Sequence, residues 1–215
     1  MKNLIQVAID SPAAAGAGTQ AKLISKHYKL FYLDTGKIYR FIAKLKIKNK
    51  KKFNYLLVKK EIKKLKISNL NDKSLISNKI AIEASIVAKD PKIRKIVNNF
   101  QIKCAYHPPK KFNGSVLDGR DITSVIMKDA MFKFFITATV KTRALRRFKE
   151  LKSLKRKISY NDVLKSIKKR DKSDYNRKYS PLKKTKDSIL INTTNLTKKA
   201  CFLKIKNIIE KEIKY

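Results

Sequence analysis

Nine arginines stand out among the basic side chains of this 215-residue sequence, because the other 45 of its 54 Lys and Arg residues are lysine. Lys, Asn and Ile share A/T-rich codons and are all abundant, so a bias in base composition explains the lysines. An arginine that persists under such a bias is expected to need its planar guanidinium, which grips a phosphate or a base edge with two parallel hydrogen bonds. The candidates are Arg40, Arg94, Arg120, Arg143, Arg146, Arg147, Arg156, Arg170 and Arg177.

A second candidate is the stretch IDSPAAAGAGTQAK, residues 9–22, which follows an apolar run over residues 4–9. It approaches the phosphate-binding pattern GxxxxGKS or GxxxxGKT, in which backbone N–H groups and a lysine surround the phosphates of a nucleotide. Ser11 stands at the first glycine of that pattern, Gly16 is kept, and Ala17 occupies the lysine position. Taken alone the stretch is a weak signal, because many α/β proteins have a small-residue turn between a strand and a helix.

The composition narrows the class of protein. The length fits one domain with a sizeable core. The sequence contains neither a run of 18 apolar residues nor a signal-peptide pattern. We therefore expect a cytoplasmic protein that does not enter a membrane. Two cysteines and two histidines match neither a disulfide framework nor a metal-ligand spacing, so no structural metal site is expected. The net charge of +38 suits a polyanion, but the lysines are spread along nearly the whole chain, so no specific nucleic-acid partner is expected.

Hydrophobic periodicity indicates the elements that must position these residues. Apolar runs over 4–9, 30–34, 132–139 and 187–194, with another that ends at Asp118, predict five strands. Helical spacing over 19–28, 37–47, 140–156, 160–176 and 196–213, and after Pro91, predicts helices between them. Residues 44–79 are predicted as a further helical region that ends in a turn, SNLNDKS.

Strands that alternate with helices favour a mostly parallel sheet covered on both faces. Ligands of such sheets lie at the carboxyl ends of the strands. The turn after Ile9, the TG after Asp34, the GRD after Leu117 and the segment after Thr139 are all at such ends. The sequence therefore predicts a ligand site at this one edge.

Four separated stretches together resemble the bacterial cytidylate kinases of the nucleoside monophosphate kinase family. They are IDSPAAAGAGTQAK (9–22), FYLDTGKIYR (31–40), LDGRDITSVI (117–126) with KFFITATVKTRALRR (133–147), and IKKRDKSDYNRKYSPL (167–182). They occur in the family's order and cover most of the chain except about residues 45–80. LDTGxxYR, DGRD and RDxxDxNRxxxPL are specific motifs.

The resemblance implies an α/β fold, a three-layer P-loop kinase core with a five-stranded, mainly parallel sheet. It implies one kinase domain over residues 1–215, with a monophosphate-binding insertion at about 36–110 and a helical lid at about 143–175. The implied reaction moves the γ-phosphoryl group of ATP, with Mg²⁺, onto CMP or dCMP. Catalysis would rest on positioning and charge neutralisation. A monomer is expected.

The resemblance also assigns roles to residues, and eight of the nine arginines lie where the family uses one; Arg156 has no role. The acceptor phosphate would be bound by Thr35, Arg40, Arg120 and Arg177. The cytosine would be read by Ser85, Arg94 and Asp121. The sugar would be held by Arg170 and Asp174. The catalytic group would comprise the lid arginines Arg143, Arg146 and Arg147, which contact the transferring phosphoryl group, and Asp118, which could hold hydrated magnesium. The ATP-binding loop would be Ser11, Pro12, Ala13, Ala14, Ala15, Gly16, Ala17, Gly18 and Thr19.

Each assignment has a simpler alternative when taken alone. Arg146 and Arg147 could be solvated helix residues, Asp121 could cap a turn, Thr35 could be a helix N-cap, and Arg94 could lie on the surface. Their joint occurrence in the family's order favours the functional interpretation.

Ala17 leaves three interpretations open. In the first, the enzyme is active because another cation, Lys37 or a lid arginine, reaches the γ-phosphate. In the second, the protein is an impaired kinase that still binds CMP. In the third, it has become a nucleotide-binding or RNA-associated basic protein. We favour the first, because drift in a dead enzyme should have eroded the arginines too. Adenylate kinases carry a DGFPR-like segment in place of DGRD and lack the RDKSDYNR run, so cytosine is the preferred base. The sequence leaves open the choice between CMP, dCMP and UMP.

Overall fold

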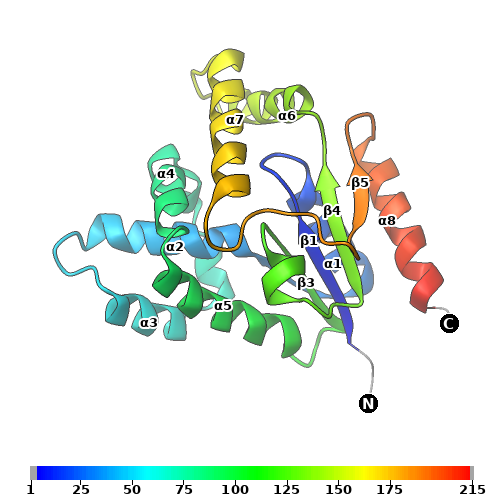
Figure 1. Ribbon diagram of the computed structural model, residues 1–215, viewed down its shortest axis with the longest axis horizontal. Helices are drawn as coiled ribbons and strands as arrows, with labels where there is room; N and C mark the ends of the chain where they lie inside the picture. The colour runs from blue at the N-terminus through cyan, green and yellow to red at the C-terminus, as the bar shows by residue number, and fades with distance from the viewer. Residues whose placement is uncertain (1–3, 214–215) are drawn as a thin grey trace.

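The computed structural model describes residues 4–213, apart from the side chain of Asn78. At its centre is one sheet of five parallel strands (Figure 1), which confirms the predicted architecture. The strands lie in the order β2-β3-β1-β4-β5, so β1 is central, and its Val7 lies beside Val116 on one neighbour and Phe132 on the other. The strands are β1 (Ile5–Asp10), β2 (Phe31–Asp34), β3 (Gly114–Gly119), β4 (Phe132–Thr137) and β5 (Ile189–Asn192).

Except for α4, which the periodicity did not predict, the helices lie close to where it predicts them. They are α1 (Ala17–Tyr28), α2 (Thr35–Lys48), α3 (Tyr55–Lys64), α4 (Asn78–Val87), α5 (Pro91–Tyr106), α6 (Val140–Ser153), α7 (Tyr160–Asn176) and α8 (Lys198–Ile213). Between α3 and α4 the predicted turn is instead two 3₁₀ helices, η1 (Ile67–Asn71) and η2 (Lys73–Ile76). Asp72 caps the second of them by accepting the Ser74 N–H at 2.8 Å. After β3 comes a π-helical turn, η3 (Ile122–Ile126).

Two hydrophobic clusters cover the two faces of the sheet. Side chains alternate between the faces along a strand, so Val7 and Ile9 pack with α1 and α8, whereas Ala8 packs on the side of α2 and α5. The cluster that contains Ala8 extends into α3 and α4 through Val58, Ile62 and Ala84, so the region between β2 and β3 shares the main core.

The helices α6 and α7 lie beyond the carboxyl ends of the strands (Figure 1). They pack on each other through a small cluster of their own, formed by Ala144, Leu151, Val163 and Ile167. This pair therefore overhangs the edge where the ligand site is predicted.

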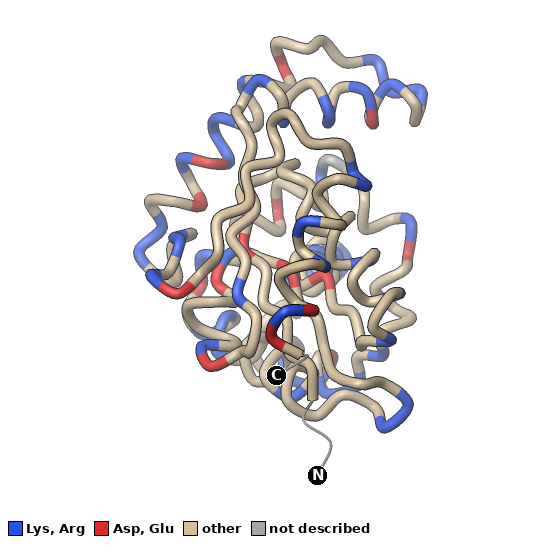
Figure 2. Tube along the Cα trace, turned by 90° about the vertical axis from the view of Figure 1, so that its right-hand side faces the viewer, with Lys and Arg blue, Asp and Glu red and all other residues tan. Residues whose placement is uncertain are grey.

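Lys and Arg are distributed along most of the described chain trace (Figure 2), as the sequence predicts. Within residues 4–213 no helix is long and apolar enough to cross a membrane.

Candidate active site

The loop between β1 and α1 has the backbone of an anion-binding turn. Ala14 and Gly16 have φ values of +60° and +97°, and α1 begins at Ala17, directly after the second of them. The first N–H groups of a helix have no intrahelical acceptor and carry the positive end of its dipole, so they bind phosphate readily. Ala17 is buried, and its methyl group adds no donor to these N–H groups.

Two of the three predicted lid arginines lie against this loop. Arg143 Nη1 donates to the Ala13 carbonyl at 3.1 Å, and its Nη2 lies 2.7 Å from Asp171 Oδ2. Arg146 Nη1 donates to Ala15 O at 3.5 Å and to Thr193 Oγ1 at 2.8 Å. The simpler alternative of a solvated helix residue is therefore wrong for Arg146.

The third lid arginine and Lys37 are not held at the loop. Arg147 Nη1 pairs with Glu150 Oε2 at 2.8 Å, one turn along α6. The half-buried Lys37 makes no side-chain hydrogen bond or ion pair with the part of the chain that the structure describes. Among the cations discussed for the missing lysine, Arg146 and Arg143 therefore hold contacts with the loop and Lys37 holds none.

Three predicted acceptor residues from distant segments form a buried ion-pair group. Arg94 Nη2 on α5 pairs with Asp121 Oδ2, and Arg177 Nη2 lies 3.6 Å from Asp121 Oδ1. Arg94 is 3% exposed, so its surface alternative is wrong. Asp121 precedes η3 without forming a side-chain cap bond, so the turn-cap alternative is wrong as well. Burial lowers the pKa of Arg177, and the charge of Arg94 acts in the same direction.

A second ion pair joins the GRD turn to α7. Arg120 Nε lies 2.8 Å from Asp174 Oδ2, and Arg170 Nε approaches the same oxygen at 3.9 Å. Arg40 donates from Nη1 to Leu75 O at 2.9 Å. Burial lowers the pKa of Arg40, and the charges of Arg147 and Arg120 act in the same direction.

Two predicted acceptor residues have other contacts. Thr35 is the first residue of α2, and its hydroxyl donates to Asp118 O at 2.8 Å. Asp34 is the N-cap instead, accepting the Lys37 N–H at 3.3 Å, so the cap alternative for Thr35 is wrong. Ser85 is exposed on α4 and donates to the Ile82 carbonyl of its own helix.

Asp118 lies at the end of β3, beside the first turn of α1. A Cβ placed on Gly18 would be 3.5 Å from Asp118 Oδ2 and 3.5 Å from the Tyr32 hydroxyl. Burial, together with the nearby charge of Asp34, raises the pKa of Asp118 to about 7. Asp118 Oδ1 is buried and has no hydrogen-bond partner among the described residues. A carboxylate oxygen in this position suits Mg²⁺, which prefers oxygen ligands.

Sequence reasoning missed the groups that hold these residues. The fully buried Asp10 carboxylate accepts the N–H groups of Ile122 and Thr123, each at 2.8 Å, and the Thr123 hydroxyl at 2.6 Å. It therefore joins the end of β1 to the turn that carries Arg120 and Asp121. Asp10 ends an apolar run and precedes the loop, and this position in the sequence could have indicated its role. Of the partners of the predicted lid arginines, Asp171 lies within the RDxxDxNR motif, which was a signal, and Thr193 carried none.

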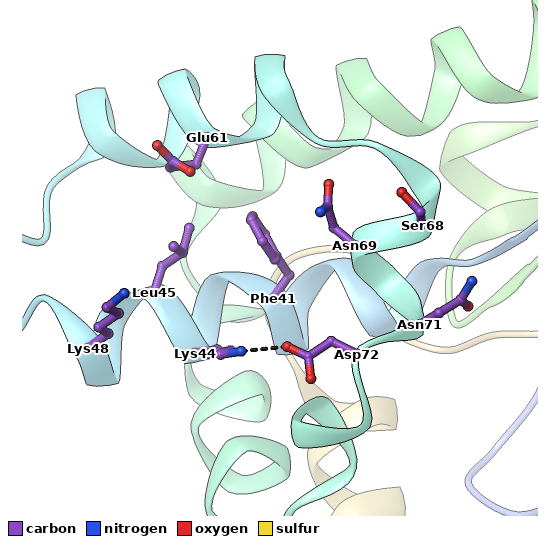
Figure 3. Close-up of a pocket in the computed structure, with 9 residues that line it drawn as sticks. All are labelled: Phe41, Lys44, Leu45, Lys48, Glu61, Ser68, Asn69, Asn71 and Asp72. Carbon is purple, nitrogen blue, oxygen red and sulfur yellow. Dashed lines mark hydrogen bonds and ion pairs between the residues drawn. The ribbon is translucent and has the colours of Figure 1, made fainter.

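A cavity of about 590 Å³ lies away from these residues, between α2, α3 and η1 (Figure 3). It is lined by Phe41, Lys44, Leu45, Lys48, Glu61, Ser68, Asn69, Asn71 and Asp72. None of the predicted site residues lines it, and its Lys44 is already paired with Asp72.

The decisive comparison is with known families. The family model described as cytidylate kinase matches residues 7–211. The chain belongs to the cytidylate kinase family. A cytidylate kinase of Clostridium botulinum (strain Okra / Type B1) is 41% identical over 217 residues, covering 97% of this chain and 99% of that protein. One of Bartonella tribocorum (strain CIP 105476 / IBS 506) is 40% identical, covering 91% of this chain and 90% of that protein.

Among solved structures, an uncharacterized protein from Eubacterium ventriosum ATCC 27560 has the same fold. The TM-score is 0.51 at 19% identity, covering 94% of this chain and 96% of that one. This likeness supports the fold, and the family membership rests on the sequence relatives.

Proposed function

We propose that this cytidylate kinase family member transfers the γ-phosphoryl group of ATP to CMP or dCMP, giving CDP or dCDP. One observation carries the proposal: the ion-pair groups built on Asp121 and Asp174 gather arginines from α5, the GRD turn, α7 and the segment after it. A dianionic acceptor phosphate needs several such donors at once.

Cytosine is the base that suits the Arg94–Asp121 pair. The Asp121 carboxylate accepts a hydrogen bond from the 4-amino group, and the Arg94 guanidinium donates to N3 and O2. Ser85, from the adjacent α4, is proposed as a further contact to the base. Arg170 and Asp174 hold the sugar in this proposal.

The phosphate end of the acceptor is bound by Arg40, Arg120 and Arg177, with Thr35 beside them. Arg120 and Arg177 are held by carboxylates in the structure, so they are oriented before the substrate arrives. Preorientation of this kind reduces the cost of assembling the charged site around the reacting phosphates.

The donor half is the loop over residues 11–19 with Mg²⁺ at Asp118. Magnesium bound there would neutralise charge on the ATP phosphates. Helices α6 and α7 are proposed as the lid, and the region from α2 to α5 as the monophosphate-binding insertion. Closure of the lid would bring its arginines onto the transferring phosphoryl group and exclude water.

Arg146 is the cation that we propose in place of the missing lysine. Its contacts with Ala15 O and Thr193 Oγ1 hold its guanidinium at the loop, and Lys37 has no such contact. A charge-assisted hydrogen bond to phosphate contributes about 1.5–3 kcal/mol, which corresponds to about 10–150-fold in rate if it acts in the transition state. The loop without lysine is therefore expected to be slower than one with it, and still active.

The test is ADP release by the purified protein with ATP, Mg²⁺ and CMP. We expect turnover in the unaltered protein, none above background in Asp121→Ala, and a gain of about tenfold or more in Ala17→Lys. Arg146→Ala should lose about tenfold or more, whereas Lys149→Ala, an exposed residue of the same helix, should not. Unchanged activity in Arg146→Ala would refute its role, and a loss in Lys37→Ala would transfer that role to Lys37.

Inactivity of both the unaltered protein and Ala17→Lys would refute the kinase proposal. Thermal stabilisation by CMP would then identify an impaired kinase that still binds its acceptor. Tight, salt-sensitive binding of RNA with no effect of CMP would identify the nucleic-acid alternative.

A further inference from the structure

One face of α5 is polar and buried. Arg94, Asn98 and Gln101 follow one another at spacings of four and three residues, which places them on the same side of the helix. Gln101 is 1% exposed. Each of the three has a buried atom without a hydrogen-bond partner among the described residues: Arg94 Nε, Asn98 Oδ1 and Gln101 Oε1.

Tyr39 of α2 packs against this face. The Arg94 guanidinium lies over its ring, with Cζ 5.5 Å from the ring centroid, which is the geometry of a cation–π contact. Burial raises the pKa of Tyr39 to about 12, and the charges of Arg94 and Arg177 and the nearby Gln101 amide oppose that rise. The Tyr39 hydroxyl is also buried without a partner in the described part of the chain.

Buried polar atoms are normally paired, so a concentration of unpaired ones needs an explanation. The Tyr39 ring lies against the guanidinium that, in the proposed function, reads the base, and the Gln101 amide lies near the Tyr39 hydroxyl. An apolar side chain at this helix–helix interface would pack without leaving a buried polar atom unpaired. The polar side chains of Tyr39 and Gln101 are therefore more easily explained by a role at the site than by a contribution to stability.

We propose that Tyr39 and Gln101 are positioning residues that fix the guanidinium plane of Arg94 and thereby select cytosine over uracil. The inference rests on the proposed function. Cytosine presents an acceptor at N3, which suits a guanidinium N–H, whereas uracil presents an N3–H donor that opposes it. A fixed Arg94 therefore binds cytosine and rejects uracil, whereas a guanidinium free to rotate discriminates less.

The experiment compares CMP and UMP, both as substrates and as ligands in calorimetry, for Tyr39→Phe and Gln101→Met. Tyr28→Phe is the matched control, because it removes a hydroxyl that donates to Lys206 O at 3.5 Å, against α8. We expect the CMP-over-UMP preference to fall by about 3–10-fold in both variants, the scale of one lost hydrogen bond. The KM for ATP should stay within about twofold, and the control should keep the full preference.

A merely structural role would weaken CMP and UMP equally, or lower the stability of the variants and leave the preference intact, and either result would overturn the inference. Calorimetry keeps the two proposals apart. If the unaltered protein prefers CMP as a ligand without turning it over, the kinase proposal fails and the preference ratio of the variants still decides this one. If the unaltered protein binds CMP and UMP equally, this inference is wrong whatever the catalytic result.

Discussion

Asp10 is expected to make the stability of the protein depend on pH, and a single substitution should remove that dependence. Burial raises the pKa of Asp10 from 3.8 to about 6, against the opposing effect of its three hydrogen-bond donors. At about 1.4 kcal/mol per pKa unit, the difference corresponds to about 3 kcal/mol. An acid that binds its proton more tightly when folded stabilises the protein at low pH, so the Asp10 contribution to the free energy of unfolding falls as pH rises from 3.8 through 6. Roughly 1.5 kcal/mol, half of this contribution to the free energy of unfolding, is lost between pH 5 and pH 8.

The assay is urea denaturation of the unaltered protein and Asp10→Asn at pH 5 and pH 8. Asparagine cannot titrate, so the stability difference between the two proteins should shift by about 1.5 kcal/mol in favour of the variant at the higher pH. Asp187→Asn is the control, because the ion pair with Lys133 lowers the pKa of Asp187 to about 2 and its effect lies below pH 4. A stability difference for Asp10→Asn that is the same at both pH values would show that Asp10 is ionised in the native state throughout, which would refute the reasoning.

Two substitutions of small residues, Ala14→Gly with Ala15→Gly as its control and Gly119→Ala, test the backbone at the site. Ala14→Gly should raise the free energy of unfolding by up to about 1 kcal/mol, because the left-handed backbone at Ala14 (φ +60°) disfavours a Cβ. The backbone of Ala15 is not left-handed, so Ala15→Gly should lower the free energy of unfolding by a similar amount. Thermal denaturation distinguishes the two, and a loss in Ala14→Gly contradicts the strain argument. Gly119→Ala should cost about 1–3 kcal/mol, since its Cβ would be 2.5 Å from Thr35 Oγ1 and 2.8 Å from Ile122 Cδ1. Urea denaturation measures this cost, and a neutral result would mean that Thr35 moves away freely.

The sequence was sufficient for the sheet because buried parallel strands are apolar runs of a length that helices do not share. Its errors are the ends of some elements, the turn predicted at SNLNDKS, and helix α4, which it did not predict. The fifth strand was predicted over 187–194 and spans Ile189–Asn192, because residues 185–188 form a turn in which the Ser188 N–H donates to Thr185 O at 3.2 Å. The segment SNLNDKS was predicted as a turn, but Asn, Asp and Ser also cap short 3₁₀ helices, and the cap at Asp72 is of that kind.

Few residue types grip phosphate and the motifs are specific, so the sequence could nominate the arginines of the proposed site, and the structure brings Arg94 and Arg177 together at Asp121. The contacts themselves could not be predicted, because they cross large separations in the chain. Asp10 and Thr123 are 113 residues apart, and Arg146 and Thr193 are 47 apart. Gln101 lies outside every stretch that carries the resemblance, so no motif pointed to it. Its burial, which only the fold establishes, is what makes it informative.

In the proposed function, the donor and acceptor halves of the site are held by different groups, which would allow the loop to lose its lysine while the acceptor half is kept. The acceptor arginines are held by Asp121 and Asp174, with Asp10 fixing their turn from behind. The donor loop is held by Arg143, Arg146 and Thr193, none of which contacts an acceptor carboxylate. A substitution at Ala17 therefore changes the charge offered to ATP without loosening the acceptor arginines. For the same reason Ala17→Lys should alter kcat and the KM for ATP while leaving the KM for CMP nearly unchanged, and a large change in the KM for CMP would mean that the two halves are coupled through the loop.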